Sequence, residues 1–546
     1  MIENHLLSLL IFVPLLAALA ILVVPKAQSH LYRWVTLAAL AVDLILTLVL
    51  VFQFDKSISG IGAKALQFVE NLPWIDLQLG STTAISIRYF LGVDGLSITM
   101  VLLSAIVLLI GVISSWKIKE NAKGYFILYL ILSASVVGCF VALDFFLFYL
   151  FFEFMLLPMY FLIGMWGGKR REYASIKFFL YTLVGSIFIL IVMIALSISV
   201  IAPNPEIDVH SFDLMLMMDN ANFIPDSILS IESTDTLFGL SYRLCAFLLI
   251  MIGFAIKLPA VPVHTWLPDA HVEAPTPISV VLAGILLKIG GYGFYRIGYS
   301  IFPEGAHFFG WWIGLFGVIA IIYGALVAMA QSDLKRLIAY SSVSHMGFVL
   351  LGMAALTAQS VSGSIFQMFS HGLISAALFL IAGVIYDRTK DRQIANYSGL
   401  ATKVPYFTVV VLVTFFASLG LPGFSGFIAE FLVLAGAFDG AVNSQIISTS
   451  FAIAGVVGLI LGAAYFLWTL QRMFFGSYWV SDEKWQLSDL TTREYLMFVP
   501  LLALILLFGI FPGLILDLSN ETIMGFVDYV NEQGKENLSL IMKNLR

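Results

Sequence analysis

The sequence predicts an all-α polytopic membrane protein with about 14 transmembrane helices. Charged residues make up 11% of the 546 residues, against roughly a quarter in soluble domains, and the mean hydropathy is +0.98. Apolar segments of roughly 20 residues, the length that crosses a bilayer as a helix, recur along the chain. Such a chain uses lipid as its solvent, so its net charge of −6 carries no information on nucleic-acid binding.

The apolar segments are separated by short polar stretches. We place them at 5–24, 31–52, 92–115, 125–143, 145–166, 174–200, 243–257, 277–299, 308–329, 335–356, 364–386, 404–438, 450–474 and 494–516. The seventh is short, and the twelfth is interrupted at Leu421-Pro422-Gly423. Proline and glycine free backbone groups, so such a break is tolerated only where protein or water satisfies those groups. The first segment exceeds the ~7–15 apolar residues of a signal peptide, and we expect it to be a retained span.

Two stretches are not typical of a span. Residues 67–89 alternate apolar and polar side chains around Leu79-Gly80-Ser81, which predicts a β-hairpin outside the membrane. The tail after Asp517 mixes polar and apolar residues, and we expect a short interfacial helix there.

The sequence contains no motif for a metal or redox centre. Its two cysteines, Cys139 and Cys245, lie in separate apolar segments without a CxxC partner. No GxGxxG or GxxxxGK[ST] motif follows a predicted strand. We therefore expect no cofactor, nucleotide or metal in this chain.

Basic residues predict the orientation, because cytoplasmic loops carry an excess of Lys and Arg. Most Lys and Arg residues between the spans fall on one side, to which we assign Lys335. The segment 201–241, on the other side, holds several acidic residues and neither Lys nor Arg. We assign Arg243 and Arg296 to that outer side, and expect both termini there.

Six ionisable residues lie several positions from either end of a predicted span: Glu153, Lys257, Lys288, His345, His371 and Glu430. A charge at the bilayer centre costs ~2.5–3.5 kcal/mol on insertion scales, and such residues usually mark ion or proton pathways. Distributed over at least five spans at similar depth, they form a hydrophilic axis parallel to the membrane. The axis predicts a proton-translocating subunit.

Other polar residues have a plainer interpretation. A single buried histidine is about as often a helix–helix hydrogen bond as a relay. We interpret Asp43 and Cys139 as structural. For His264, Asp269, His271 and Glu273, near the basic side, two interpretations stay open: they line a path for proton uptake, or they cap helix ends.

The energetics favour a coupled chain of groups. Separating a Glu–Lys pair from ~4 to ~10 Å at an effective dielectric of ~20 changes its interaction by roughly 2.5 kcal/mol. Moving one charge against a potential near ~180 mV costs about 4 kcal/mol. Breaking one pair is therefore insufficient, and desolvation or a further charge such as Lys288 must contribute.

Four motifs resemble the antiporter-like membrane subunits of respiratory complex I (NADH:quinone oxidoreductase) and of Mrp-type cation/proton antiporters. They are GVDGLS (92–97), FEFMLLPMYFLIGMWGG (152–168), VHTWLPDAHVEAPTPISVVLAGILLK (263–288) and SDLKRLIAYSSVSHMGF (332–348). The resemblance covers about spans 3 to 13. It implies fourteen helices, with helices 4–8 and 9–13 as two inverted repeats and with broken helices 7 and 12.

The resemblance also implies roles for the six residues. Glu153 and Lys257 correspond to an input pair, Lys288, His345 and His371 to relay residues, and Glu430 to the output residue. Most relatives carry lysine at the position of Glu430, whereas one branch within NADH:quinone oxidoreductases carries glutamate. This chain follows that branch.

The resemblance implies a division of the chain and a set of partners. The divisions are 1–120 (helices 1–3 with the hairpin), 121–300 (first repeat), 301–476 (second repeat) and 477–546 (helix 14 and tail). FMN, iron–sulfur clusters and quinone belong to partner subunits. The expected neighbours are L- and N-type subunits of the membrane arm, in a bacterial inner membrane with both termini periplasmic.

Three functions stay open. The first is a proton-pumping subunit of NADH:quinone oxidoreductase. The second is a sodium/proton antiporter subunit of Mrp type, or the arm of a membrane-bound hydrogenase. The third is a structural spacer between pumping subunits.

Overall fold

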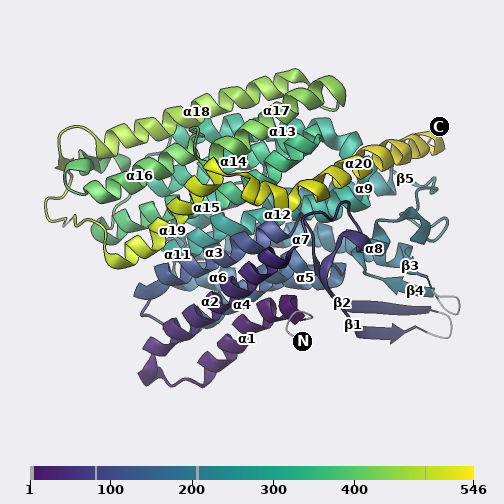
Figure 1. Cartoon of the computed structure of the whole chain (residues 1–546), viewed down its shortest axis with the longest axis horizontal. Coiled ribbons are helices and arrows are strands. Elements are labelled where there is room, and N and C mark those ends of the chain that lie inside the picture. The colour runs from purple at the N-terminus through teal and green to yellow at the C-terminus, as the bar shows by residue number, and fades with distance from the viewer. Residues whose placement is uncertain (1–4, 80–82, 204–207, 486, 546) are drawn as a thin grey trace.

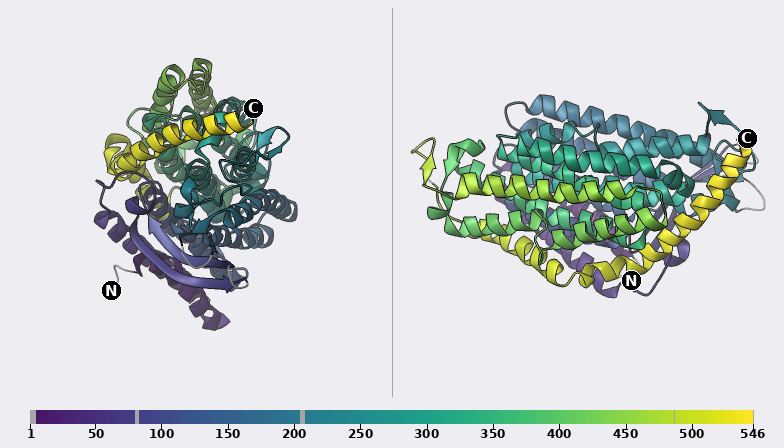
Figure 2. Two further views of the ribbon diagram at one scale, coloured as in Figure 1. Left: turned by 90° about the vertical axis from the view of Figure 1, so that its right-hand side faces the viewer. Right: turned by 90° about the horizontal axis from the view of Figure 1, so that it is seen from above.

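A computed structural model describes residues 5–79, 83–203, 208–485 and 487–545 of the chain. Its helices run side by side along the longest axis of the molecule, and the strands within residues 67–241 gather at one end, which we call the strand end (Figure 1). Figure 2 shows the helices grouped around a few central ones when the molecule is seen end-on.

The described residues in the first part of the chain contain ten α-helices, and strands lie between some of them in the sequence. The helices are α1 (Leu6–Val23), α2 (His30–Gln53), α3 (Ile98–Ser114), α4 (Ala122–Val141), α5 (Phe145–Phe154), α6 (Leu156–Trp166), α7 (Arg171–Ser199), α8 (Leu214–Met217), α9 (Tyr242–Lys257) and α10 (Trp266–Glu273). One continuous helical stack follows: α11 (Thr276–Val281), the π-helix η6 (Leu282–Leu286), α12 (Leu287–Gly293) and the π-helix η7 (Phe294–Tyr299).

The second part of the chain is mostly helical and contains a pair of two-residue strands that lie far apart in the sequence. Its helices are α13 (Pro303–Met329), α14 (Leu334–Ala355), α15 (Ala358–Thr389), α16 (Pro405–Ser418), α17 (Ser425–Asn443), α18 (Thr449–Phe474), α19 (Thr492–Ile510) and α20 (Gly513–Asn544). Short 3₁₀ turns join several of the helices in both parts.

The prediction of a multi-pass helical membrane protein is confirmed. In the described part of the chain, thirteen helices are long and apolar enough to cross a membrane by length and composition. The predicted seventh span is α9, which has 16 residues and is shorter than these thirteen. The chain leaves the helical conformation between α9 and α10, and again between α16 and α17.

The predicted hairpin is confirmed by β1 (Gln67–Gln78) and β2 (Thr83–Val93), which pair antiparallel. Of the predicted turn residues, Gly80 and Ser81 lie outside the described residues. The sheet is larger than the sequence predicted, because β3 (Ile201–Ala202) and β4 (Asp208–Ser211) extend it in the order β1-β2-β4-β3. Two further pairs of short strands are absent from the prediction as well, namely β5–β6 (Thr236–Leu237, Leu240–Ser241) and β7–β8 (Tyr397–Ser398, Trp479–Val480).

Side-chain caps fix where several helices begin. The Asp144 carboxylate accepts the Leu147 N–H at the start of α5. Asp333 accepts the first free N–H groups of α14. Thr357 forms a capping box at the start of α15. These side chains satisfy backbone donors that the first helical turn leaves without a partner.

Helices divide into an inner and an outer set. The stack from Thr276 to Tyr299 and α15 bury all of their most apolar window, and α14 buries 94% of its own. In α2 and α18 only 33% of that window is buried, and large apolar side chains such as Ile45 and Ile460 are exposed. Outer helices that expose apolar side chains face lipid, so the inner helices are the place where polar side chains are sheltered from it.

The prediction of a helix in the tail is confirmed, but the helix is not short. Residues after Asp517 belong to α20, a helix of 32 residues that crosses the molecule obliquely toward the strand end (Figure 2). It packs against α13, α15 and α3. Its apolar residues recur at helical spacing and are buried, as Leu518, Phe526 and Val530 illustrate, so the tail is part of the core.

Candidate functional site

The innermost helices bring Lys288 and His371 into contact. Lys288 lies on α12 and His371 on α15, and their Nζ and Nδ1 atoms are 2.8 Å apart. Lys288 is fully buried and His371 is 4% exposed. The two residues are 83 positions apart, so only the packing of these helices places them together.

The π-helix η6 gives the Lys288 ammonium a second acceptor. Its Nζ donates a hydrogen bond to the Ala283 carbonyl at 2.5 Å, five residues earlier in the chain. A π-turn widens the helix and is frequent at functional sites. A lysine in this place has polar partners on two sides although no carboxylate contacts its Nζ among the described residues.

The Lys288–His371 contact holds one transferable proton. A charged ammonium can only donate, so Nδ1 of His371 must then accept and the ring must be neutral. If His371 instead carries its proton on Nδ1, Lys288 must be the neutral amine. Two alternative protonation states of one contact are what a relay between these groups requires.

A second pair lies beside the first. The His345 ring, on α14, is 3.1 Å from Glu430 on α17, measured from Nδ1 to Oε1. The His345 and His371 ring centroids are 5.5 Å apart. Lys288, His371, His345 and Glu430 therefore follow one another as a continuous group, which we call the connected cluster.

A small cavity lies within the connected cluster. It is lined by both histidines, Glu430, Gln367, Ser418, Ile374, Ala417 and Gly426. Nε2 of Gln367 is 3.5 Å from Nδ1 of His345, and Oγ of Ser418 is 3.4 Å from its Nε2. Oε1 of Gln367 is buried and has no hydrogen-bond partner among the described residues. Sequence reasoning missed Gln367 and Ser418, because uncharged polar side chains on a helix are ordinary.

The break before α17 shapes this part of the site. Ser418 ends α16, and Glu430 lies one and a half turns into α17. Gly420 has a φ of +74°, and a Cβ there would lie 2.5 Å from Oε2 of Glu430. Glycine is therefore required both by the backbone and by the nearby carboxylate.

The other two predicted residues, Lys257 and Glu153, have different surroundings. Nζ of Lys257, at the end of α9, is buried without a hydrogen-bond partner among the described residues, and so is Oε1 of Glu153 on α5. The ammonium lies over the Phe152 ring at 4.8 Å and near the Phe178 ring at 5.9 Å. Aromatic faces attract a cation, but they cannot accept a proton from it. We call Glu153 and Lys257 the isolated pair.

Apolar packing separates Lys257 from Lys288. A Cβ on Gly290 would lie 2.7 Å from the Leu258 nitrogen and 3.0 Å from the Phe254 carbonyl oxygen. The backbones of α9 and α12 are thus in direct contact, and the Leu258 side chain is fully buried. The six residues lie in two groups with an apolar region between them.

The residues near the basic side have mixed surroundings. The Asp269 carboxylate is 2.7 Å from Nζ of Lys177 and 3.3 Å from Nη2 of Arg336. The Glu273 carboxylate accepts the Arg170 N–H at 2.9 Å. These contacts tie α10 to its neighbours and favour a structural interpretation of both carboxylates.

The two histidines of this region lack such partners. Both ring nitrogens of His264 and of His271 are buried without a hydrogen bond among the described residues. His271 stacks on Phe379 with ring centroids 4.2 Å apart. The choice between proton uptake and structure stays open for these two residues.

Three of the basic residues that were assigned to one side of the membrane or the other are buried. Arg243, Arg296 and Lys335 are 2%, 1% and 4% exposed. Arg243 pairs with Glu304, and Arg296 pairs with Asp94. All three lie at ends of predicted spans, where a long side chain is expected to reach water. Each carboxylate partner comes from another part of the sequence, so spacing could not reveal the pairs.

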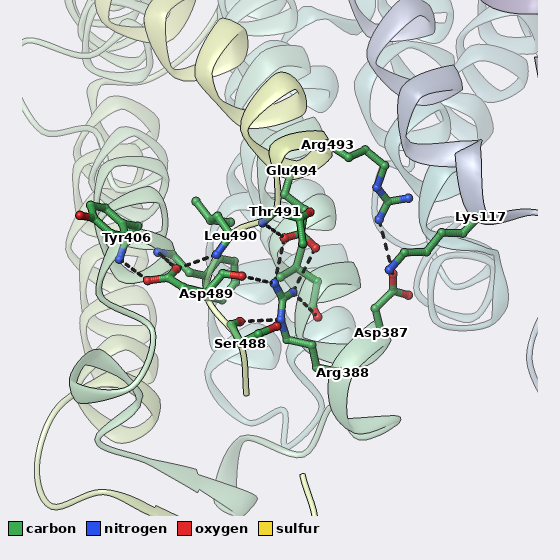
Figure 3. A network of polar contacts seen from close by, with 12 residues as sticks. Lys117, Asp387, Arg388, Tyr406, Ser488, Asp489, Leu490, Thr491, Arg493 and Glu494 are labelled. Carbon is green, nitrogen blue, oxygen red and sulfur yellow. Dashed lines mark hydrogen bonds and ion pairs between the residues drawn. The ribbon is translucent and has the colours of Figure 1, made fainter. Parts of the chain in front are cut away.

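A polar network at the end opposite the strand end holds α15, α16 and α19 together (Figure 3). Arg388 donates five hydrogen bonds: two to the Glu494 carboxylate, and one each to the carbonyls of Val384, Ser488 and Asp489. The Asp489 carboxylate accepts the first free N–H groups of α16, from Tyr406 and Phe407. Arg388 thereby anchors the helix that precedes the break at Ser418.

Comparison with known proteins gives consistent matches over almost the whole chain. Residues 142–462 match the family described as "NADH:quinone oxidoreductase/Mrp antiporter, TM". The chain is 43% identical over 528 residues to a Rhodobacter capsulatus protein named NADH-quinone oxidoreductase subunit M, with 96% of each chain covered.

Solved structures agree with this match. A chain of respiratory complex I from Thermus thermophilus superposes with a TM-score of 0.76 at 27% identity, covering 96% of this chain and 99% of that one. A chain of the Mrp complex from Dietzia sp. superposes with a TM-score of 0.78 at 21% identity over 99% of this chain and 100% of that one, which is a likeness of fold. The protein therefore belongs to the family of membrane subunits shared by NADH:quinone oxidoreductases and Mrp antiporters.

Proposed function

We propose that the protein is a proton-translocating membrane-arm subunit of a NADH:quinone oxidoreductase, of the kind named subunit M in its relatives. The observation that carries the proposal is the connected cluster. Its four ionisable residues come from four helices, are buried, and lie next to one another in space from Lys288 to Glu430. Burying such groups without a function is costly, and the relatives' name supplies the reaction that would use them.

The mechanism we propose moves protons between these side chains. Glu153 and Lys257 take up the proton, Lys288, His371 and His345 pass it on, and Glu430 releases it. Each transfer in the connected cluster changes which partner of a contact donates. Electrons stay in partner subunits, which hold FMN, iron–sulfur clusters and quinone, and the chain is a translocase subunit without a redox or nucleotide site of its own.

The proposed organisation follows the family. Residues 121–300 and 301–476 form two inverted five-helix repeats, in which helices 7 and 12 are broken, with 1–120 and 477–546 outside them. The gaps in helical structure after Lys257 and after Ser418 support this division. The neighbours are L- and N-type subunits in a bacterial inner membrane, and the strand end with both termini lies on the periplasmic side.

The test uses the whole purified complex reconstituted into liposomes. Lys257→Ala removes the amine of the isolated pair, and Glu153→Gln removes its carboxylate. For each variant we expect NADH-driven acidification to fall by about 10-fold or more. The matched control is Lys177→Ala, a lysine of a neighbouring helix with a partly exposed partner, Asp269. An assembled Lys257→Ala complex that pumps as wild type would contradict the proposal.

An Mrp-type antiporter subunit is the second candidate, favoured by the TM-score of 0.78 with the Dietzia chain. Glutamate at position 430 and the 43% identity to a subunit M favour the oxidoreductase. Extraction of the native complex in mild detergent separates the two. A peripheral arm that contains flavin identifies the oxidoreductase, whereas partners that are all membrane subunits identify the antiporter.

A further inference from the structure

Two buried arginine–carboxylate pairs lie toward the strand end of the helices. In the first, Nε of Arg243 is 2.6 Å from Oε1 of Glu304. In the second, Nη2 of Arg296 is 2.5 Å from Oδ1 of Asp94. All four side chains are at most 2% exposed, so the pairs are matched in chemistry and in burial.

The Arg243–Glu304 pair is saturated with hydrogen bonds. Nη1 and Nη2 of Arg243 donate to the carbonyls of Leu229 and Ile301, both at 3.0 Å. The second carboxylate oxygen of Glu304 accepts from Asn537 at 3.2 Å. Every heavy atom of both charged groups has a protein partner, as a purely structural pair requires.

The Arg296–Asp94 pair is open. Nε of Arg296 donates to the Tyr292 hydroxyl at 3.0 Å. Nη1 of Arg296 and Oδ2 of Asp94 have no hydrogen-bond partner among the described residues. Buried polar atoms are nearly always hydrogen-bonded, to protein or to internal water. These unpartnered atoms indicate a hydrated pocket around the pair.

The open pair lies on the same helical stack as Lys288. Lys288, Tyr292 and Arg296 follow one another at intervals of four residues, about one turn each, and the whole interval spans about 12 Å along the axis. Asp94 directly follows β2, a strand of the strand end. Arg296 therefore stands between the connected cluster and the strand end.

We propose that Arg296, held in place by Asp94 and Tyr292, is an electrostatic barrier that keeps protons on the strand-end side from reaching Lys288 through hydrated protein. A guanidinium stays charged at every accessible pH, so it cannot pass a proton on. A fixed arginine beside a water-filled path raises the energy of an approaching cation, as arginines do in pores that exclude protons. The inference rests on the proposed function, because a barrier is needed only if Lys288 carries protons.

The test measures passive leak rather than pumping. Whole complexes that carry Arg296→Gln are reconstituted into liposomes with an internal pH dye, and an imposed potassium diffusion potential drives protons while no NADH is present. Losing a charge about 12 Å from Lys288 at an effective dielectric of ~20 changes proton occupancy there about tenfold, and we expect the leak to rise by about that factor. Arg243→Gln, which disrupts the saturated pair, is the matched control and is expected to leave the leak at the wild-type level.

Two further variants separate charge from structure. Arg296→Lys keeps the charge, so its leak is expected to stay close to that of the wild type. Tyr292→Phe removes only the hydroxyl that holds Nε, and a leak between those of wild type and Arg296→Gln is expected. It also serves if Arg296→Gln complexes fail to assemble.

Three results would overturn the barrier. The first is a wild-type leak in assembled Arg296→Gln complexes or, where these do not assemble, in Tyr292→Phe complexes. The second is an equal leak in Arg296→Lys and Arg296→Gln. The third is loss of pumping without leak in Arg296→Gln, which would identify an outward transfer path instead. None of these outcomes depends on whether Lys257→Ala complexes pump, so the proposed function and the barrier fail separately.

Discussion

From Lys288 to Glu430 the buried ionisable groups follow one another through hydrogen bonds and a ring contact. At the other end, the Lys257 ammonium lies over an aromatic ring, and neither its Nζ nor Oε1 of Glu153 has a hydrogen-bond partner in the described part of the chain. Each hydrogen-bonded pair of the connected cluster can share a proton without moving any helix. The isolated pair must first approach, or be hydrated, before its proton can leave.

The difference locates the step at which transfer is controlled. The backbones of α9 and α12 touch at Gly290, and the buried Leu258 side chain stands beside that contact. Charge does not cross such apolar packing without water or a change of structure. We infer that the control point lies between Lys257 and Lys288.

The largest effect is expected from breaking the connected cluster at its first member. Lys288→Ala removes the donor to His371, and NADH-driven pumping is expected to fall by about 10-fold or more. Lys288→Arg keeps the charge but cannot release a proton, so pumping should be lost here too. Normal pumping by the arginine variant would show that Lys288 acts only through its charge. Acidification of liposomes and assembly on native gels are measured together.

Replacing Arg388 tests how firmly the connected cluster is supported. Arg388→Lys leaves at most three of the five hydrogen bonds that Arg388 donates, and the loss is expected to cost about 2 kcal/mol of stability. The measurement is the temperature at which the purified complex loses its activity, compared with Lys390→Arg at a neighbouring exposed position. An unchanged transition temperature in Arg388→Lys would show that the network does not contribute to the stability of the complex.

A smaller effect is expected at Gln367, which lines the cavity of the connected cluster without titrating. Gln367→Leu removes its polar atoms beside His345, and pumping is expected to fall about 2- to 5-fold because one hydrogen-bond partner is lost. Gln367→Glu restores a polar group and should recover part of the rate. A leucine variant that pumps as wild type would remove Gln367 from the path.

The smallest effect is expected beside the isolated pair. Asp269→Asn weakens the contacts with Lys177 and Arg336, which are partly exposed, and ion pairs of this kind contribute about 0–1 kcal/mol. Thermal inactivation of the complex should therefore shift far less than in Arg388→Lys. An equal shift would mean that the two gaps in helical structure are supported to the same degree.

Hydropathy predicted the spans well because lipid exposure is a property of whole segments. It failed for α20, whose charged residues lower the average, although Leu518, Phe526 and Val530 recur at helical spacing. It also did not predict β3 and β4, which are two and four residues long and depend on the pairing of β4 with β2 and of β3 with β4.

The six ionisable residues could be selected from the sequence, because a charge within an apolar span stands out. Their grouping could not, since the Lys288–His371 contact joins residues 83 positions apart. Arg296 and Asp94 were missed for the same reason, with 202 positions between them. Long-range packing decides which buried charges come into contact, and local sequence patterns carry no information on that packing.

The most direct test of the central claim is the number of protons pumped per electron by liposome-reconstituted complexes carrying Glu430→Gln. The substitution keeps the size of the side chain and the contact with His345 but removes the titration at the end of the connected cluster. We predict fewer protons per electron than in the wild type while the assembled complex still oxidises NADH. An unchanged ratio in an assembled complex would contradict the claim that protons pass through these residues.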